Sequence, residues 1–415
     1  MVVAPHRFSL RGIANALEER PPSLAVDLVG VAAQLYAADR SNRRGRSWKR
    51  RLRVPVVVSE IEPWSRTRSY LENALSRLTD DEWRIDLRDG RQPLPEERQP
   101  WLLKLKEHEL TSVALFSGGL DSFAGATAWL EEHPEEILGL VSISSSTVTG
   151  KVQQNLVEFL RLNFPDRIHH LRVPLNLVDA PDVERSQRTR GLVYTAIATA
   201  IANCAGVERV LIFENGYGSI NPRLLEYQDG AQATKSTHPN VVHLLEVAYR
   251  KTGIACRLEL PHVTETKAEL LNRVPERLRS GMRLSVSCDG FPLRIKDSKQ
   301  CGHCGSCILR QQAFRGAGLG AFDRDDYLSS PFRGGQHLRH LILMAFQAKQ
   351  LAELTNYDLP QVAASWPEVV LGLDGQLSLE RIEWLQMLHR YGLEWQKIAE
   401  GEPVLASRLG WGARS

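Results

Sequence analysis

The stretch that decides the fold is Leu115-Phe116-Ser117-Gly118-Gly119-Leu120-Asp121-Ser122. A short apolar run, residues 113–116, leads into the glycines, and apolar residues at helical spacing follow them. We therefore expect a buried strand, a glycine turn and the start of a helix. The first N–H groups of a helix lack intrahelical partners and lie at the positive end of its dipole. The stretch predicts a phosphate-binding loop, with an ordinary strand-to-helix turn as the alternative.

Length and composition limit the class of protein. A chain of 415 residues with 43% hydrophobic residues is long for one core, so we expect about two or three domains. The net charge of +3 argues against extensive nucleic-acid binding. No apolar run of about 18 residues is found, and the N-terminus lacks the apolar core of a signal peptide. These features predict a cytoplasmic protein without a membrane span.

Residues 1–100 have the pattern of a small α+β module. Apolar residues recur at helical spacing over 24–36 and 70–78, whereas residues 52–58 and 83–87 alternate as strands do. The proline-rich segment 91–100 indicates a linker. Residues 40–53 carry eight basic side chains around Trp48, which is one way to bind nucleic acid. We favour a solvated hairpin tip or a contact with an acidic protein for this run.

Residues 101–280 alternate between strand and helix. Strands are expected over 137–142, 168–173 and 210–213, and helices over 156–162, 192–205, 244–249 and 270–278. Such alternation predicts an α/β fold with a parallel sheet, in which ligands bind beyond the carboxyl ends of the strands. Two further loops, 142–151 and 214–223, are expected at that edge. They supply the candidate substrate-binding residues Ser144, Glu214, Asn215, Gly216, Asn221 and Arg223.

Two cations at predicted helix starts are further catalytic candidates. Arg190 opens the alanine-rich helix, where its guanidinium is placed to reach phosphates. Lys267 lies between Thr266 and Glu269, which have the spacing of a capping box. The alternative for both is an ordinary surface cation.

Four cysteines cluster in the region 281–322. Cys288 precedes Cys301-Gly302-His303-Cys304-Gly305-Ser306-Cys307. Four thiolates at this spacing suit a closed, tetrahedral and therefore structural Zn²⁺ site. An iron–sulfur cluster is the main alternative, and unliganded reduced cysteines are the other.

Together these motifs resemble the PP-loop ATP pyrophosphatases, and within them the QueC family, 7-cyano-7-deazaguanine synthases. The phosphate loop, Arg190 with its helix, Lys267-Ala268-Glu269 and the cysteine segment occur in the family's order over roughly residues 111–322. The resemblance implies ATP- and Mg²⁺-dependent adenylation of 7-carboxy-7-deazaguanine, and a zinc knuckle. It also implies that Asp121 lies near Mg²⁺ and that the ATP-binding residues are Phe116, Ser117, Gly118, Gly119, Leu120, Asp121 and Ser122.

The sequence departs from the compact family in two ways. The loops 142–151 and 214–223 differ from the family's substrate segments, and a C-terminal region, 323–415, is added with helices expected over 337–351 and 379–388. This long form is similar to the QueC-like proteins of the anti-phage Qat and type IV CBASS systems. The resemblance implies a ligase that joins a deazaguanine to an amine of a partner protein from the same operon. A nitrile synthase that uses ammonia and an inactive nucleotide-binding scaffold are the alternatives, with a transfer-RNA thiolase less favoured.

Overall fold

The computed structural model describes residues 23–406, with gaps. The segments outside the description are 1–22, 46–47, 91–108, 145, 175–182, 225–234, 296–298, 325, 334–336, 355–361, 363, 368, 370–377, 403–404 and 407–415. The predicted linker over 91–100 therefore lies outside the described residues.

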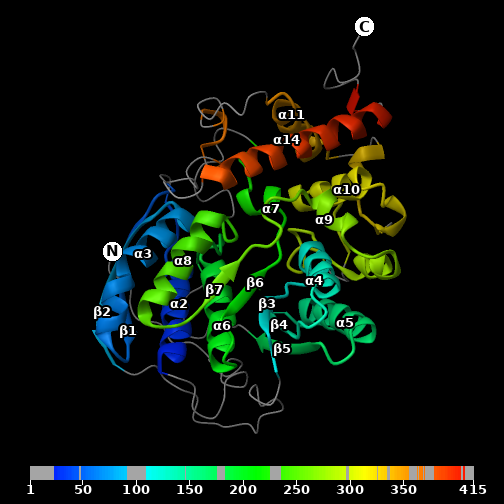
Figure 1. Cartoon of the computed structure of the whole chain (residues 1–415). Coiled ribbons are helices and arrows are strands. Elements are labelled where there is room, and N and C mark those ends of the chain that lie inside the picture. Colours follow the sequence, from blue (N-terminus) through cyan, green and yellow to red (C-terminus); the bar gives the residue numbers. More distant parts are fainter. Residues whose placement is uncertain are drawn as a thin grey trace.

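A parallel sheet of five strands forms the centre of the protein (Figure 1). Its strands are β3 (Ser112–Leu115), β4 (Leu138–Ser144), β5 (Ile168–Pro174), β6 (Arg209–Ile212) and β7 (Arg257–Glu259), in the order β5-β4-β3-β6-β7. The three inner strands, β4, β3 and β6, are buried on both faces, which explains their nearly continuous apolar sequences. The edge strands β5 and β7 also carry polar, partly exposed residues. The predicted α/β fold with a parallel sheet is confirmed. β7 was not predicted, because its three residues are too few to give a pattern in the sequence.

Helices cover both faces of this sheet. One face packs against α6 (Arg190–Cys204) and α8 (Pro239–Thr252), and the other against α4 (Leu120–Glu132), α5 (Thr147–Asn163) and α9 (Lys267–Asn272). Neighbouring residues of β3 show the division, since Val113 belongs to the first apolar cluster and Ala114 to the second. The phosphate-loop stretch therefore leaves the middle strand of a three-layer structure.

The helix expected over 270–278 is wrong in its extent. α9 ends at Asn272, and a separate 3₁₀ helix, η3, spans Glu276–Leu284. Pro275 stands between them and has no N–H for an α-helical bond, so the chain cannot continue as one α-helix. η3 then leads to Cys288, the first cysteine of the cluster.

The N-terminal module is a βαβ unit preceded by a helix. α2 (Ser23–Ser41) is followed by β1 (Arg51–Val58), α3 (Ile61–Thr79) and β2 (Glu82–Asp89), and the two strands pair in parallel. The four elements match the helices and strands expected from the sequence. α2 packs on α6 and α3 packs on α8 (Figure 1). One apolar cluster therefore runs from the module into the central sheet.

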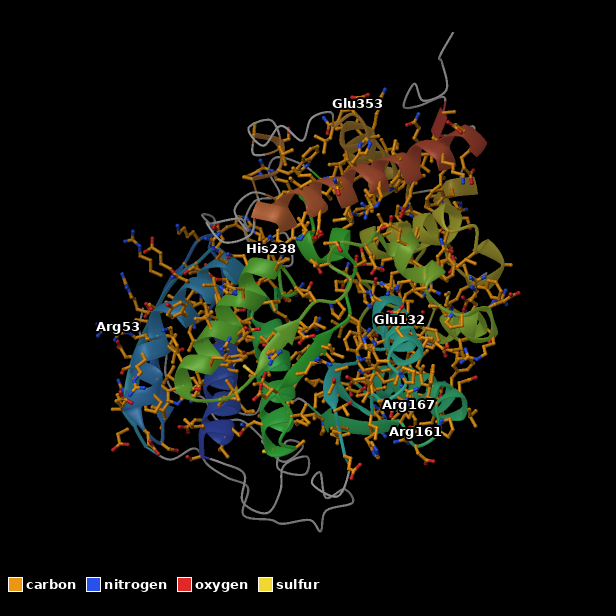
Figure 2. All side chains as sticks on the ribbon, in the orientation of Figure 1. Arg53, Glu132, Arg161, Arg167, His238 and Glu353 are labelled. Atoms are coloured by element: carbon orange, nitrogen blue, oxygen red, sulfur yellow. The ribbon has the colours of Figure 1, made fainter. Side chains whose placement is uncertain are left out.

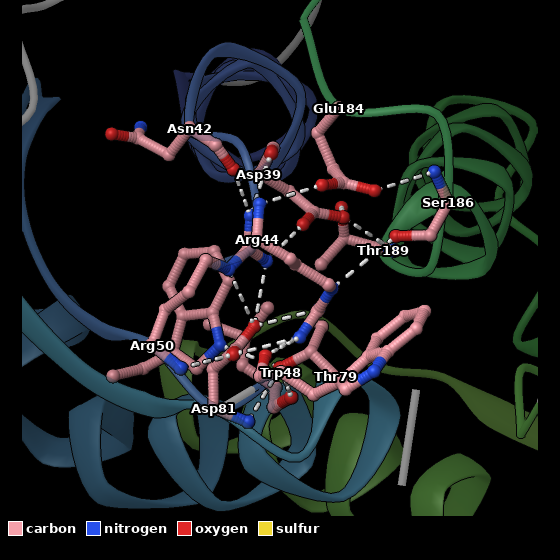
Figure 3. Close-up of polar contacts among 12 residues, drawn as sticks. Asp39, Asn42, Arg44, Trp48, Arg50, Thr79, Asp81, Glu184, Ser186 and Thr189 are labelled. Carbon is pink, nitrogen blue, oxygen red and sulfur yellow. Dashed lines mark hydrogen bonds and ion pairs between the residues drawn. The ribbon is translucent and has the colours of Figure 1, made fainter. Parts of the chain in front are cut away.

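The basic run 40–53 is only partly the solvated tip that we favoured from the sequence. The side chains of Arg40, Arg44 and Arg50 are buried, whereas Arg43, Lys49, Arg51 and Arg53 are exposed. Arg44 donates to both carboxylate oxygens of Asp81, at 2.9 and 2.8 Å. Arg50 pairs with Asp81 at 2.6 Å and with Asp39 at 2.5 Å (Figure 3). The side chains of Asp39 and Asp81 are fully buried. Like charges that are close in sequence are tolerated here because two carboxylates lie between them.

The same network connects the module to the segment that precedes α6 (Figure 3). Asp39 accepts from the N–H and the hydroxyl of Thr189, at 3.2 and 2.9 Å, and Glu184 accepts from the N–H of Arg44 at 2.8 Å. Arg53, by contrast, points outward at the edge of the module and pairs with Asp86 at 2.6 Å (Figure 2).

The C-terminal region packs across the carboxyl edge of the sheet (Figure 1). α11 (Arg339–Ala352) and α14 (Ser378–Gly401) share an apolar cluster with α7 (Gly216–Ile220) and with part of α10 (Gly305–Gly316). Both predicted C-terminal helices are present, and α14 extends to Gly401. No helix among the described residues has the length and apolarity needed to cross a membrane.

Candidate functional site

The loop between β3 and α4 has the geometry expected of a phosphate loop. Gly118 has φ of +82°, a conformation that side chains rarely adopt. A Cβ atom at Gly118 would also lie 3.1 Å from the Gln153 side chain. Gly119 precedes the first turn of α4, and no side chain caps that helix. The loop thus brings backbone N–H groups and the helix dipole to the carboxyl end of the middle strand.

The hydroxyls of the loop are held close together. Ser117 Oγ accepts from the Gly119 N–H at 3.2 Å and lies 3.2 Å from Ser122 Oγ. Ser122 Oγ in turn donates to the Gly119 carbonyl at 3.0 Å. Leu120 N–H donates to Ser287 Oγ at 3.4 Å. These are the side chains and backbone groups predicted to face phosphates, and Phe116 beneath them is buried.

Two residues that donate hydrogen bonds to the carbonyls of the loop, Gln153 and Val286, could not be identified from the sequence. The buried Gln153 amide, on α5, donates to the carbonyls of Phe116 and Ser117 at 3.4 and 3.2 Å. Val286 N–H donates to the Gly118 carbonyl at 3.1 Å from the segment that leads to Cys288. The cysteine-rich region therefore buttresses the loop directly.

Asp121 and Lys267 form a buried ion pair beside the loop. Lys267 Nζ donates to Asp121 Oδ2, and both side chains are largely shielded from solvent. Lys267 is also the first residue of α9, behind a complete capping box of Thr266 and Glu269. The predicted capping box is confirmed, and the lysine is not a surface residue.

Two residues of the loop after β6 join this pair. Asn215 Nδ2 donates to Asp121 Oδ1 and to Glu214 Oε1, each at 2.9 Å. Burial and the nearby Asp121 carboxylate raise the pKa of Glu214 to about 8, against the opposing effect of Lys267. The structure thus brings two carboxyl groups and one ammonium together at the carboxyl ends of β3 and β6. This arrangement can accept a cation or hold a proton close to the phosphate loop.

The other predicted site residues have different surroundings. Arg190 is exposed at the start of α6, donates to Gln187 at 3.0 Å and lies over the Tyr194 ring. Ser144 ends β4 and is half-buried. Gly216 donates its N–H to the Glu265 carbonyl at 2.8 Å, and Asn221 ends α7 in the left-handed conformation. Arg223 donates to the Ser365 carbonyl at 3.5 Å, toward the C-terminal region.

The four cysteines converge as predicted. The sulfur atoms of Cys288, Cys301, Cys304 and Cys307 all lie within 4.8 Å of one another. A tetrahedral zinc with Zn–S bonds of about 2.3 Å requires sulfurs about 3.8 Å apart, and the Cys301 and Cys307 sulfurs are 3.8 Å apart. Backbone N–H groups point at the sulfurs, two at Cys288 and two at Cys301, as suits thiolates. The cluster therefore fits a zinc knuckle.

The fold and the loop define an α/β protein with a phosphate loop of the PP-loop kind. The family model described as "Queuosine biosynthesis protein QueC" matches residues 188–318, a range that includes Lys267 and all four cysteines. The chain is 26% identical over 232 residues to the 7-cyano-7-deazaguanine synthase of Synechococcus sp. (strain CC9902), covering 50% of this chain and 94% of the relative. It is 26% identical over 241 residues to that of Syntrophobacter fumaroxidans (strain DSM 10017 / MPOB), covering 52% and 95%. The protein is thus QueC-like over about half of its length.

Proposed function

We propose that the protein is an ATP-dependent ligase that adenylates the carboxylate of a 7-carboxy-7-deazaguanine. The substrate oxygen attacks the α-phosphorus of ATP, the bond to the β-phosphate breaks, and pyrophosphate leaves. The observation that carries this proposal is the Asp121–Lys267 pair next to the glycine loop. The similarity to two synthases of 7-cyano-7-deazaguanine supports the deazaguanine as substrate.

Each residue has a role in this proposal. The loop 116–122 binds the phosphates through its N–H groups and hydroxyls, and Arg190 approaches them from α6. In this proposal Asp121 would hold Mg²⁺, which would neutralise phosphate charge when bound. Lys267 stabilises the negative charge that develops on the phosphates. Ser144, Glu214, Asn215, Gly216, Asn221 and Arg223 form the substrate side.

The second half of the reaction forms an amide. An unprotonated amine attacks the acyl carbon, AMP leaves with the bonding electron pair, and the nitrogen releases one proton to give the amide. We propose that this amine belongs to a partner protein encoded with this chain in an anti-phage operon, as the resemblance to the Qat and type IV CBASS proteins implies. A terminal amine suits the reaction, because its pKa of about 8 is lower than the value of about 10.4 for lysine.

The contacts of the C-terminal region support an altered acceptor side. Tyr217, in the loop after β6, stacks on Tyr391 of α14 with ring centroids 4.0 Å apart. The Tyr217 hydroxyl donates to Gln347 of α11 at 2.7 Å, and Gln347 donates to the Arg223 carbonyl at 2.7 Å. The added helices α11 and α14 thus contact the predicted substrate loop. A compact small-molecule synthase has no such helices to support its substrate loop.

Product analysis tests the proposal. The protein is incubated with ATP, Mg²⁺ and 7-carboxy-7-deazaguanine, with and without each operon protein, and intact masses and AMP are measured. We expect AMP and an adduct on one partner. Free nitrile that forms with ammonia, without an adduct, would support the nitrile synthase instead. ATP binding without AMP or pyrophosphate under any condition would support the inactive scaffold.

A further inference from the structure

α14 reaches the first turn of α9 from the far side of the candidate site. Thr266 is fully buried and caps α9, since its hydroxyl oxygen accepts from the Glu269 N–H at 3.1 Å. The same hydroxyl donates its hydrogen to Glu394 of α14. A threonine hydroxyl has one hydrogen, so both of its roles are used, one toward each helix. Glu394 therefore determines the orientation of this capping hydroxyl.

A second contact ties Glu394 to the cysteine-rich region. Its other carboxylate oxygen accepts from the Gln312 amide of α10 at 2.8 Å. Cys307 lies on the same helix α10. One turn earlier on α14, Arg390 donates to the carboxylate of Glu269 at 2.6 Å. Three helices, α9, α10 and α14, thus meet at Glu394. Lys267 directly follows Thr266, the threonine whose hydroxyl Glu394 holds.

We propose that Glu394 is a positioning residue for Lys267, so that the C-terminal region completes the catalytic site instead of only adding mass beside it. The inference rests on the proposed function, in which Lys267 contacts the phosphates. Lys267 Nζ must reach across to Asp121 from the first residue of a helix of only six residues. A short helix has little rigidity of its own, so its N-terminal contacts decide where the lysine lies. Glu394 of α14 supplies one of these N-terminal contacts of α9, from outside the sheet domain.

The chain offers matched variants. In Glu394→Gln the amide oxygen still accepts from Thr266, while Gln312, whose buried Oε1 lacks a partner in the described structure, can turn to accept from the new amide. Glu394→Ala removes both contacts. Glu394→Asp keeps the charge on a shorter side chain that does not span both partners, and it serves where the alanine variant fails to fold. Glu402, directly after α14, pairs with Arg315 of α10 at 3.3 Å. Glu402→Ala removes this different contact between the C-terminal region and α10, and it is the control.

The first measurement does not depend on activity. The rate at which an amine-acetylating reagent modifies Lys267 is followed by peptide mass spectrometry in the full-length protein, with the exposed Lys251 as internal reference. Lys267 is shielded and ion-paired, so we expect slow acetylation in the wild type, in Glu394→Gln and in Glu402→Ala. We expect at least about fivefold faster acetylation in Glu394→Ala and Glu394→Asp. Wild-type rates in folded forms of both variants would overturn the inference.

The second measurement separates this inference from the proposed function. For AMP release, Glu394→Ala and Glu394→Asp should lower kcat about 10- to 100-fold while KM for ATP changes less than about threefold, because a small displacement of a charge-stabilising group affects the transition state most. Equal losses in Glu402→Ala would show a general packing defect and would refute a specific role of Glu394. If the wild type releases no AMP, the proposed function fails, and the acetylation rates still decide whether Glu394 positions Lys267.

Discussion

Lys267 Nζ donates to Asp121 Oδ2 in the interior of the protein, and this ion pair joins the first turn of α9 to the first turn of α4. The two residues are 146 positions apart in the chain. The phosphate loop immediately precedes α4, so the pair places a positive charge next to the predicted phosphate site. Glu214 and Asn215 extend the pair to the end of β6.

Lys267→Met, alone and combined with Asp121→Asn, should separate the catalytic role of Lys267 from its contribution to stability. The substitution leaves Asp121 and Glu214 without a cation, so we expect AMP release to fall at least about 100-fold and unfolding free energy to fall by about 3–5 kcal/mol near pH 8. Adding Asp121→Asn removes one of the two negative charges and should restore much of the stability but none of the activity. Denaturant unfolding and AMP assays of both variants check this. Recovery of activity in the double variant would contradict the assigned roles.

Asp81 and Asp86 of the N-terminal module allow a buried and an exposed ion pair to be compared. Asp81 is buried between Arg44 and Arg50, whereas Asp86 meets the exposed Arg53. We expect Asp81→Ala to lower the unfolding free energy by about 3–5 kcal/mol, because the buried Arg44 loses its carboxylate and the buried Arg50 keeps only Asp39. Asp86→Ala should cost less than about 1 kcal/mol. Thermal unfolding at low and high salt tests both, and equal losses would show that the Asp81 network is not stabilising.

One zinc per chain is expected at the four cysteines. Its removal should release the segment that carries Val286, whose N–H supports the Gly118 carbonyl. Binding free energy at such a site is also folding free energy, so Cys307→Ala or a strong chelator should lower the midpoint of thermal unfolding. ATP binding should weaken as well, because the loop loses one support. Elemental analysis counts the metal, and iron with visible absorption would establish the iron–sulfur alternative.

Stability should depend on the protonation of Glu394. Burial raises the pKa of Glu394 to about 7, despite hydrogen bonds from Thr266 and Gln312 that lower it. Its pKa in the unfolded chain is about 4.3, so the folded protein binds the extra proton between these values. The contribution of Glu394 to stability is therefore greatest below about pH 4.3 and decreases as pH rises to about 7, on the order of 1–3 kcal/mol in total.

Comparison with Glu394→Gln isolates this effect. The amide does not titrate, so the stability of the variant relative to the wild type should rise as pH increases from about 4.5 to 7. Unfolding free energies from denaturant titrations at several pH values measure the difference. A constant difference over this range would show that the Glu394 carboxyl titrates normally in the folded protein.

Local patterns determined the elements, the phosphate loop and the cysteine cluster. Alternation and helical spacing identified four of the five central strands and the βαβ order of the N-terminal module, because buried faces repeat with the period of each element. The glycines of the loop and the spacing of the cysteines were readable for the same reason: their constraints act over a few residues. One predicted helix, 270–278, ends early because Pro275 interrupts it, and β7 was too short to give a pattern.

Only the tertiary structure decided which distant residues meet. The basic run 40–53 has the appearance of a solvated surface in sequence, yet Asp39 and Asp81 bury Arg44 and Arg50 within the module. Lys267 has the local pattern of an ordinary capping turn, and its pairing with Asp121 depends on how α9 packs against α4. Ion pairs and hydrogen bonds between side chains act over only a few ångströms and leave no period in the sequence. The arrangement of the elements in space therefore determines these contacts.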